Sequence, residues 1–375
     1  MLITNPIELK RFYTCHRVWQ GIPGIAHTPG GRTFISFYSG GVAEDYGNFA
    51  AVIRSDDETN FTEPVAVALK EGEYRCFDPV LWLDPLGRLW FIWNVMPGEE
   101  VFASVCEDPD AETLSWSEEF QIGRGIMMNK PLVCGGGEWL FPIAIWRKDI
   151  YSEMREKGMK PEDVAGAYLY KTCDCGKTFT RLGFVDMPHR TFDEHMVYEQ
   201  KDATLRMLVR LEKGQEKGIG ESYSADGGLT WSDGVPVMEG PSSRFFIQKL
   251  PSGRVLFINH HNFTGRNNLT AFLSEDDGKT FPYSLLLDER KSVSYPDAQL
   301  CADGFIRITY DRQRGCFKSS MEEVYTFARE ILVAKITEED ILAGKLVTEG
   351  SELQKVVSKL GELAPEDGDP FRQAK

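Results

Sequence analysis

One short pattern occurs three times in the second half of the chain, and its spacing constrains the fold more than any other feature does. Each copy reads Ser or Thr, x, Asp, x, Gly, x, Thr and an aromatic residue, with its acid at Asp174, Asp226 or Asp276. The three acids are 52 and then 50 residues apart, a period typical of a four-stranded propeller blade rather than of a helical repeat. Polar side chains that satisfy backbone N–H groups, followed by a Gly that takes positive φ, predict a hairpin turn in each copy.

Weaker copies of the pattern extend the repeat toward the N-terminus. Residues 55–61 contain a degenerate copy, residues 106–116 contain another, and a last unit is expected around residues 293–335. Between the copies, stretches such as 81–93 and 247–259 alternate strand-forming residues with a Gly-containing turn. The sequence therefore predicts an all-β protein, a six-bladed β-propeller spanning residues 1–335.

Two segments depart from this strand rhythm. Residues 148–163 are highly charged and poor in β-branched residues, which predicts a small helical insertion. Residues 336–375 are expected to form a C-terminal helical extension and a flexible tail. Thr337 resembles an N-cap ahead of an acidic first turn, and Gly344 is a candidate for the end of that helix.

Composition and charge exclude several classes of partner. The formal net charge of −15 argues against nucleic acid, because a phosphate backbone requires a basic surface. Since neither a signal-peptide pattern nor a bilayer-spanning apolar run is present, we expect a cytoplasmic location and no membrane partner. The eight cysteines have no paired spacing and no metal-binding motif is found, so neither a metal nor an organic cofactor is expected.

Propellers bind ligands at one end of their central channel, where side chains from different blades converge. Candidate site residues are therefore charged or phenolic groups within apolar segments near the starts of blades, since such groups are costly to bury without a role. Those that meet this description are Asp45, Asp78, Glu194, Arg210, Arg266 and Tyr295.

The repeats are similar to the Asp-boxes of sialidases, and the surrounding segments resemble the sialidase superfamily over about residues 17–335. The resemblance implies that Asp45, in the segment Asp-Tyr-Gly-Asn, is the general acid/base and that Tyr295 is the nucleophile. It pairs Glu194 with Arg210 and places Arg266 before an Asp-box. It also implies that Asp78 contacts the substrate.

These roles are chemically consistent with one another. A sugar whose anomeric carbon carries a carboxylate repels an anionic nucleophile, whereas a neutral phenol avoids this repulsion. With an ordinary pKa of about 10, Tyr295 needs a base, which Glu194 can provide. Asp45 would protonate the leaving oxygen, and arginines would bind the carboxylate bidentately. The hypothesis is a retaining exo-glycosidase that releases a terminal acidic sugar (sialic, other ulosonic or uronic) from a small acidic oligosaccharide or glycoside.

One departure from the family pattern bears on the substrate. Where sialidases begin their first blade with Arg-Ile-Pro, this chain reads Gly21-Ile-Pro, and a second family arginine near the acid/base loop is replaced by the segment Ser-Gly-Gly at 39–41. Arg17, Arg244 or Arg312 are candidates to compensate for the first loss. We therefore expect an ulosonic or uronic acid other than a common sialic acid.

Further substrate contacts are predicted for Asn129 and Lys130, at an expected inner-strand start, and for Arg244. Two other functions fit the same fold. The first is hydrolysis or elimination at a uronate-linked sugar by a histidine, for which the candidates are His195, His260 and His261. The second is a carbohydrate-binding propeller without catalytic activity.

Overall fold

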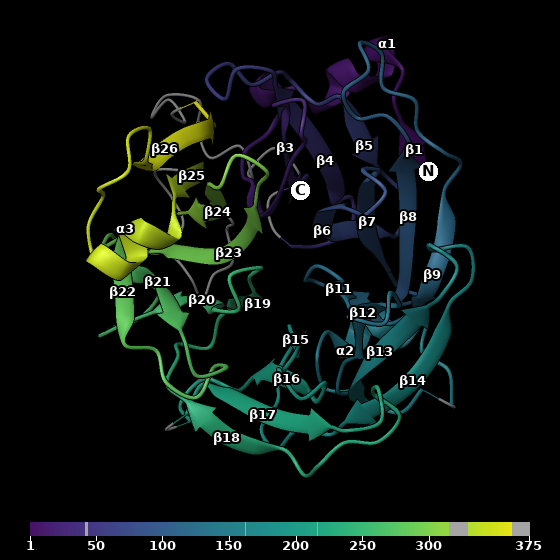
Figure 1. The fold of residues 1–375 in the computed structure, drawn as a ribbon. Coiled ribbons are helices and arrows are strands. Elements are labelled where there is room, and N and C mark those ends of the chain that lie inside the picture. Colours follow the sequence, from purple (N-terminus) through teal and green to yellow (C-terminus); the bar gives the residue numbers. More distant parts are fainter. Residues whose placement is uncertain (42–43, 162, 216, 315–328, 362–375) are drawn as a thin grey trace.

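The computed structural model describes residues 1–41, 44–161, 163–215, 217–314 and 329–361. Six antiparallel sheets follow one another around a ring, which confirms the predicted six-bladed propeller (Figure 1). Within the described residues, no helix is both long enough and apolar enough to cross a membrane. Each blade is formed by one continuous stretch of chain, so contacts between blades must close the ring.

The first three blades share a common order, in which successive strands pair from the central channel outward. Blade 1 consists of β2 (Gly21–His27), β3 (Thr33–Ser39), β4 (Phe49–Ser55) and β5 (Ala66–Ala68), with β1 (Leu2–Ile3) paired to β5. Blade 2 consists of β6 (Arg75–Leu83), β7 (Leu89–Met96), β8 (Glu100–Cys106) and β9 (Phe120–Arg124). Blade 3 begins with two short strands, β10 (Ile126–Met127) and β11 (Leu132–Val133), followed by β12 (Trp139–Ile145), β13 (Gly166–Thr172) and β14 (Thr180–Val185).

The last three blades have four strands each in the same order. Blade 4 consists of β15 (Met196–Glu199), β16 (Leu205–Arg210), β17 (Ile219–Ser224) and β18 (Val235–Met238). Blade 5 consists of β19 (Phe246–Lys249), β20 (Val255–His260), β21 (Leu269–Ser274) and β22 (Tyr283–Asp288). Blade 6 consists of β23 (Val293–Leu300), β24 (Ile306–Arg312), β25 (Glu330–Ile336) and β26 (Glu352–Lys359).

The repeated sequence pattern forms the turn between the third and fourth strands of a blade. In blade 4, Asp226 Oδ1 accepts the backbone N–H groups of Leu229 (3.0 Å) and Thr230 (2.9 Å), and Asp226 Oδ2 accepts the Thr230 hydroxyl at 2.5 Å. Gly228 has a φ of 92°, and its N–H donates to Ser224 Oγ at 2.9 Å. The pattern therefore stabilises a turn between outer strands and contributes no side chain to the central channel.

The weaker copies occupy the same position in their blades. Asp57 accepts the backbone N–H groups of Thr59 (2.8 Å) and Asn60 (2.7 Å) between β4 and β5. Cys106 and Trp116 form an isolated bridge between β8 and β9. The copy at residues 55–61 is confirmed by the Asp57 hydrogen bonds; for residues 106–116 the structure confirms only the position in the blade.

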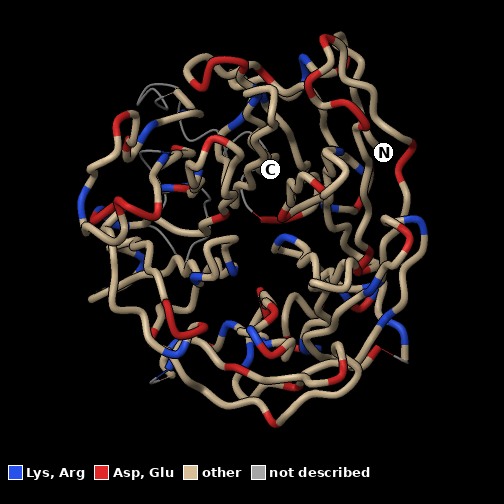
Figure 2. The backbone as a smooth tube through the Cα atoms, in the orientation of Figure 1, with Lys and Arg blue, Asp and Glu red and all other residues tan. Residues whose placement is uncertain are grey.

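The apolar core lies between neighbouring blades. Between blades 2 and 3, for example, the ring centroids of Trp82 and Trp139 are 4.9 Å apart in an edge-to-face arrangement, and Trp90 packs beside both. This packing joins the faces of neighbouring blades and does not use their inner ends. Polar side chains can therefore occupy the inner ends, which face the central channel. Figure 2 shows basic and acidic positions at the inner edge of the ring.

The ring closes between blades 1 and 6 through side-chain to backbone hydrogen bonds. Ile25 N–H donates to Asp297 Oδ2 at 2.8 Å. Gln299 accepts the N–H of His27 and donates to its carbonyl, both at 2.9 Å. These bonds satisfy backbone groups of β2 that no neighbouring strand pairs with, since β2 is the inner edge of its sheet.

The helical segments are short. They are α1 (Pro6–Leu9), η1 (Lys10–Phe12), η2 (Thr14–His16), α2 (Ser152–Arg155) and α3 (Glu338–Ala343). Helix α2 lies in the predicted insertion. Helix α3 begins and ends as predicted. Thr337 and Asp340 form a capping box, in which the side chain of each accepts the backbone N–H of the other, and Gly344 ends the helix with a φ of 65°.

The expected helical C-terminal extension is wrong in one respect. After α3 the chain returns as β26, which pairs with β25 and completes blade 6. The propeller therefore extends to Lys359, beyond the predicted boundary at residue 335. The expected flexible tail, residues 364–375, lies outside the described residues.

Candidate active site

An unusual backbone conformation recurs in four blades, within or just before the innermost strand of each. Ile22, Asp78, Glu194 and Tyr295 have φ values of 53°, 44°, 43° and 59°, in the left-handed region that disfavours side chains. In β2, β6 and β23 the pairing register shifts at this point. Each left-handed residue costs on the order of 1 kcal/mol, so the surrounding structure must hold these four backbones in place.

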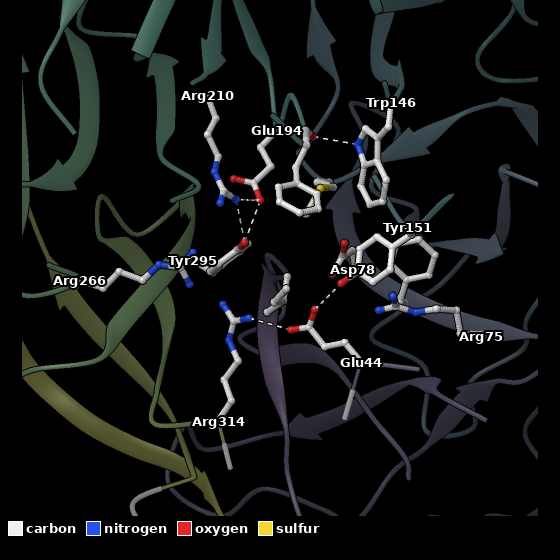
Figure 3. Close-up of a pocket in the computed structure, with 14 residues that line it drawn as sticks. Glu44, Arg75, Asp78, Trp146, Tyr151, Glu194, Arg210, Arg266, Tyr295 and Arg314 are labelled. Carbon is white, nitrogen blue, oxygen red and sulfur yellow. Dashed lines mark hydrogen bonds and ion pairs between the residues drawn. The ribbon is translucent and has the colours of Figure 1, made fainter. Parts of the chain in front are cut away.

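All four left-handed residues line one pocket at the inner ends of the blades (Figure 3). Five predicted site residues, at positions 78, 194, 210, 266 and 295, come together in it. The pocket is formed by Ile22, Glu44, Arg75, Phe77, Asp78, Met128, Trp146, Tyr151, Phe192, Glu194, Arg210, Arg266, Tyr295 and Arg314.

Tyr295, Glu194 and Arg210 form a buried cluster at the centre of this pocket. The Tyr295 hydroxyl donates to Glu194 Oε1 at 2.8 Å. Arg210 Nη1 donates to the same carboxylate oxygen at 2.5 Å and to Tyr295 Oη at 3.0 Å. Burial and the neighbouring Glu194 carboxylate raise the pKa of Tyr295, although nearby arginines oppose this shift. The phenol is therefore neutral at rest and already in contact with a base.

Arginines surround the Tyr295 ring on the side of the pocket. The guanidinium carbons of Arg314 and Arg266 lie 4.1 and 5.1 Å from the ring centroid. Arg266 Nη2 donates to the carbonyl of Ser242 at 3.0 Å, and Arg210 donates to the Ser242 hydroxyl at 3.2 Å. A single serine thus orients two of the arginines next to the phenol.

Asp78 is the buried carboxyl group on the opposite side of the pocket. Its side chain is almost completely buried, and Oδ1 has no hydrogen-bond partner. Burial, with smaller contributions from the Glu44 and Glu194 carboxylates, raises the pKa of Asp78 to about 7. A large share of Asp78 is therefore protonated at neutral pH, as a proton donor must be.

The predicted acid/base residue Asp45 lies elsewhere. Its side chain is exposed, its Oδ1 accepts the backbone N–H of Tyr46 at 2.7 Å, and it is not among the residues that line the pocket. The preceding residue, Glu44, lines the pocket and accepts hydrogen bonds from Arg314 Nη1 and the Tyr151 hydroxyl, both at 3.2 Å. The loop backbone thus directs the first of two adjacent acids inward.

Arg244 was predicted to bind substrate, but its donors serve backbone carbonyls of three other blades. Nη1 donates to Met128 O at 2.8 Å, and Nη2 donates to Pro23 O and Tyr295 O, both at 2.9 Å. The residue is 1% exposed and does not line the pocket. It therefore holds the inner strands together beside the pocket.

Asn129 and Lys130 also position other groups instead of lining the pocket. The Asn129 amide donates to the carbonyl of Glu194 at 2.7 Å and thereby fixes the start of blade 4. Lys130 pairs with Asp297 and donates to the carbonyl of Ile25, linking blades 3, 6 and 1. Both residues stabilise the backbone that presents the pocket side chains.

The three histidines considered for a different mechanism are also outside the pocket. His195 is buried, with Nε2 2.7 Å from the carbonyl of Tyr168, and burial lowers its pKa to about 4. His260 and His261 line a separate hollow between blades 4 and 5. Among the described residues, no group of His, Cys, Asp and Glu is arranged to hold a metal ion.

Several pocket residues were not predicted from the sequence. Trp146, Tyr151 and Phe192 form an aromatic wall, with ring centroids of Trp146 and Phe192 5.2 Å apart. Tyr151 belongs to the insertion that contains α2, so this departure from the strand rhythm was a usable signal. Arg75 and Arg314 carried no such signal, because their positions relative to the pocket depend on the packing of separate blades.

The sequence profile of the BNR repeat-like domain family matches residues 32–308. The chain belongs to this family. No curated protein sequence matches this BNR repeat-like protein. Solved structures that resemble it include the intramolecular trans-sialidase from Ruminococcus gnavus, with 14% identity and a TM-score of 0.66 over 90% of this chain and 98% of that one.

Two further structures resemble this BNR repeat-like protein. The NanB sialidase from Streptococcus pneumoniae is 12% identical, with a TM-score of 0.61 over 82% of this chain and 67% of that one. The α-L-arabinanase from Penicillium chrysogenum is 10% identical, with a TM-score of 0.53 over 86% and 94% of the two chains. At these identities the likeness establishes a sialidase-like propeller fold.

Proposed function

We propose that this protein is a retaining exo-glycosidase of the sialidase type that releases a terminal acidic sugar from a small glycan. The observation that carries the proposal is the buried contact of 2.8 Å between the Tyr295 hydroxyl and Glu194 Oε1, within a pocket lined by arginines. The fold likeness to a sialidase, an intramolecular trans-sialidase and an α-L-arabinanase supports it. The pocket residues then have the following roles.

In the first step, Tyr295 Oη attacks the anomeric carbon while its proton passes to Glu194. The bond from the anomeric carbon to the leaving oxygen breaks, and Asp78 gives its proton to that oxygen. In the second step, water attacks the glycosyl-tyrosine and loses a proton to Asp78. The bond from the carbon to Tyr295 Oη breaks, and Glu194 returns its proton to the phenolate. Two displacements at one carbon give net retention.

The arginines determine which sugar this chemistry accepts. Arg210 and Arg266 lie beside the phenol that bonds to the anomeric carbon. A carboxylate on that same carbon would lie among their guanidinium groups, which bind carboxylates through paired hydrogen bonds. This arrangement favours an ulosonic acid over a uronic acid, whose carboxylate is attached on the far side of the ring oxygen.

Asp78 replaces Asp45 in this proposal as the proton donor. Asp78 lines the pocket and has a pKa near 7, whereas Asp45 is exposed. The variants D78N and D45N distinguish the two assignments directly. We expect D78N to lose activity on substrates with poor leaving groups by about 10²-fold or more, and D45N to retain it.

The function can be tested by screening wild-type protein against fluorogenic α-ketosides of several ulosonic acids, β- and α-uronides, and neutral glycosides. We expect turnover of an α-ketoside, with the Y295F variant reduced by at least about 10³-fold. Y223F is the matched control, because Tyr223 bonds to Glu221 outside the pocket. Full activity in Y295F, turnover of neutral glycosides alone, or sugar binding without any turnover would each contradict the proposal.

A further inference from the structure

We propose that Arg314 is the third carboxylate-binding arginine of this pocket, reaching from blade 6 into the space that Gly21 leaves empty in blade 1. The sialidase resemblance places an arginine at position 21, and the chain has glycine there. This inference rests on the proposed binding of an acidic sugar. It adds a specificity-determining residue that does not occupy the position expected from the family pattern.

The space beside Gly21 is filled by the side chain of Arg314. A Cβ atom built on Gly21 would lie 2.5 Å from Arg314 Cδ, 2.7 Å from Cγ and 2.9 Å from Nε. At these distances, a side chain at position 21 would require Arg314 to move from its present position. Gly21 does not have a left-handed φ, so the backbone does not require glycine there. The glycine is explained by the arginine that passes over it.

Side chains of Asp311, Ser294 and Glu44 hold Arg314 in a defined orientation. Nε donates to Asp311 Oδ2 at 2.8 Å, Nη2 to Ser294 Oγ at 3.3 Å and Nη1 to Glu44 Oε1 at 3.2 Å. The Asp311 carboxylate also accepts the backbone N–H of Ile22 at 2.8 Å. The same acid therefore ties Arg314 to the strand that begins with Gly21, and the guanidinium is fixed before substrate arrives.

The guanidinium faces the same reacting group as the other two arginines. At 4.1 Å, it is closer to the Tyr295 ring centroid than Arg266 is, and it lines the pocket. Arg314 bonds to two acids here, of which Asp311 is fully buried (0% exposed) and Glu44 is 23% exposed. Glu44 is thus the more accessible of the two acidic partners. Binding of a substrate carboxylate would replace the 3.2 Å contact with Glu44 and leave the contact with Asp311 in place.

The geometry allows the arginine to be moved between blades by mutation. R314G removes the proposed third carboxylate-binding arginine. G21R alone introduces a side chain into the space that Arg314 occupies. The double variant G21R/R314G restores one arginine in the same space from the other strand. R312A is the matched control, because Arg312 pairs with Glu330 outside the pocket.

Binding can be measured by calorimetry in the Y295F background, so that no turnover is required. The probes are the 2,3-unsaturated forms of sialic acid and of 3-deoxyoctulosonic acid, each as the free acid and as the methyl ester. We expect R314G to weaken binding of the free acid by about tenfold or more and binding of the ester by less than about twofold. G21R/R314G should recover most of the loss, and R312A should bind like the parent.

Three outcomes would overturn the inference: equal binding of the free acid by R314G and its parent, equal loss for acid and ester, or a folded double variant that recovers nothing. Absence of acid binding by the parent would overturn it as well. If only the glycosidase proposal is wrong, the result is different. The free acid would still bind more weakly to R314G than to its parent, but the wild-type protein would turn over no glycoside. Melting temperatures of all variants separate loss of binding from loss of the fold.

Discussion

The hydroxyl of Tyr295 donates to Glu194 Oε1 at 2.8 Å, although the two residues are separated by 101 positions in the chain. Tyr295 belongs to blade 6, whereas Glu194 precedes the first strand of blade 4. Each has a left-handed backbone that turns its side chain into the pocket. The contact therefore depends on closure of the whole ring, and it places a base on the phenol that Arg210, Arg266 and Arg314 surround.

Glu194 is expected to act through proton transfer. In E194Q the phenol keeps a hydrogen-bonding neighbour but loses its base, so kcat should fall by about 10²- to 10⁴-fold while KM changes little. Steady-state kinetics on the best ketoside from the screen would measure both constants. E239Q is a suitable control because Glu239 is exposed and outside the pocket. A kcat within about threefold of wild type for E194Q would show that Glu194 is not the base.

Asp78 should produce an alkaline limb in the pH profile. As a general acid with a pKa of about 7, it is active when protonated, so kcat/KM, which reports the free enzyme, should decline as pH rises through about 7. In D78N this limb should disappear together with most of the activity. Asparagine is suitable here because it tolerates the left-handed φ of 44°. An unchanged alkaline limb in D78N would assign the titration to another group.

The same carboxyl group should also influence stability. Its folded pKa is raised above the unfolded value of about 3.9, so the folded state holds more protons between about pH 4 and pH 7. Asp78 therefore destabilises the fold increasingly as pH rises through this window, by up to a few kcal/mol. D78N should melt higher than wild type at pH 8 and show little difference at pH 4. Equal melting temperatures at pH 8 would contradict the raised pKa.

Much of the fold, and part of the site, could be predicted from the sequence because the signals are local. The Asp-box turns repeat with the blade, and Glu194, Arg210, Arg266 and Tyr295 lie in recognisable segments. The choice between Glu44 and Asp45 depends on one loop's backbone angles. Strand β26 was missed because its polar sequence, ELQKVVSK, has no long apolar run and follows the capping signals of α3. Arg314 was missed because its role depends on contact between the two ends of the ring.

The Asp-box acid Asp226 should stabilise the fold without affecting the site. Hydrogen bonds, chiefly from Thr230, lower its pKa to about 2. Its contribution is therefore present above the unfolded pKa of about 4 and is lost as pH falls toward 2. D226A should lower the melting temperature at pH 7 and leave KM unchanged, with the difference shrinking at low pH. L229A is the control, since the exposed Leu229 contributes only its backbone N–H to the turn.

Arg75 is expected to contribute to binding more than to stability. It is 1% exposed and packs 4.2 Å from the Phe77 ring centroid, yet Nε and Nη1 have no hydrogen-bond partner. Because unsatisfied buried donors are costly, R75M should melt at or above the wild-type temperature. Since Arg75 lines the pocket, KM should rise by about tenfold. A large loss of stability with unchanged KM would assign Arg75 a purely structural role.

The covalent intermediate on Tyr295 offers the most direct test of the proposed mechanism. A 3-fluoro ulosonyl fluoride of the accepted sugar combines a good leaving group with a fluorine that slows both displacements, so the glycosyl-enzyme should accumulate. Intact mass spectrometry should show one added sugar, and peptide mapping should place it on Tyr295, with no label in Y295F. Labelling of Asp78 or Glu194 instead, or hydrolysis of the compound with inversion and without any labelled protein, would contradict the account.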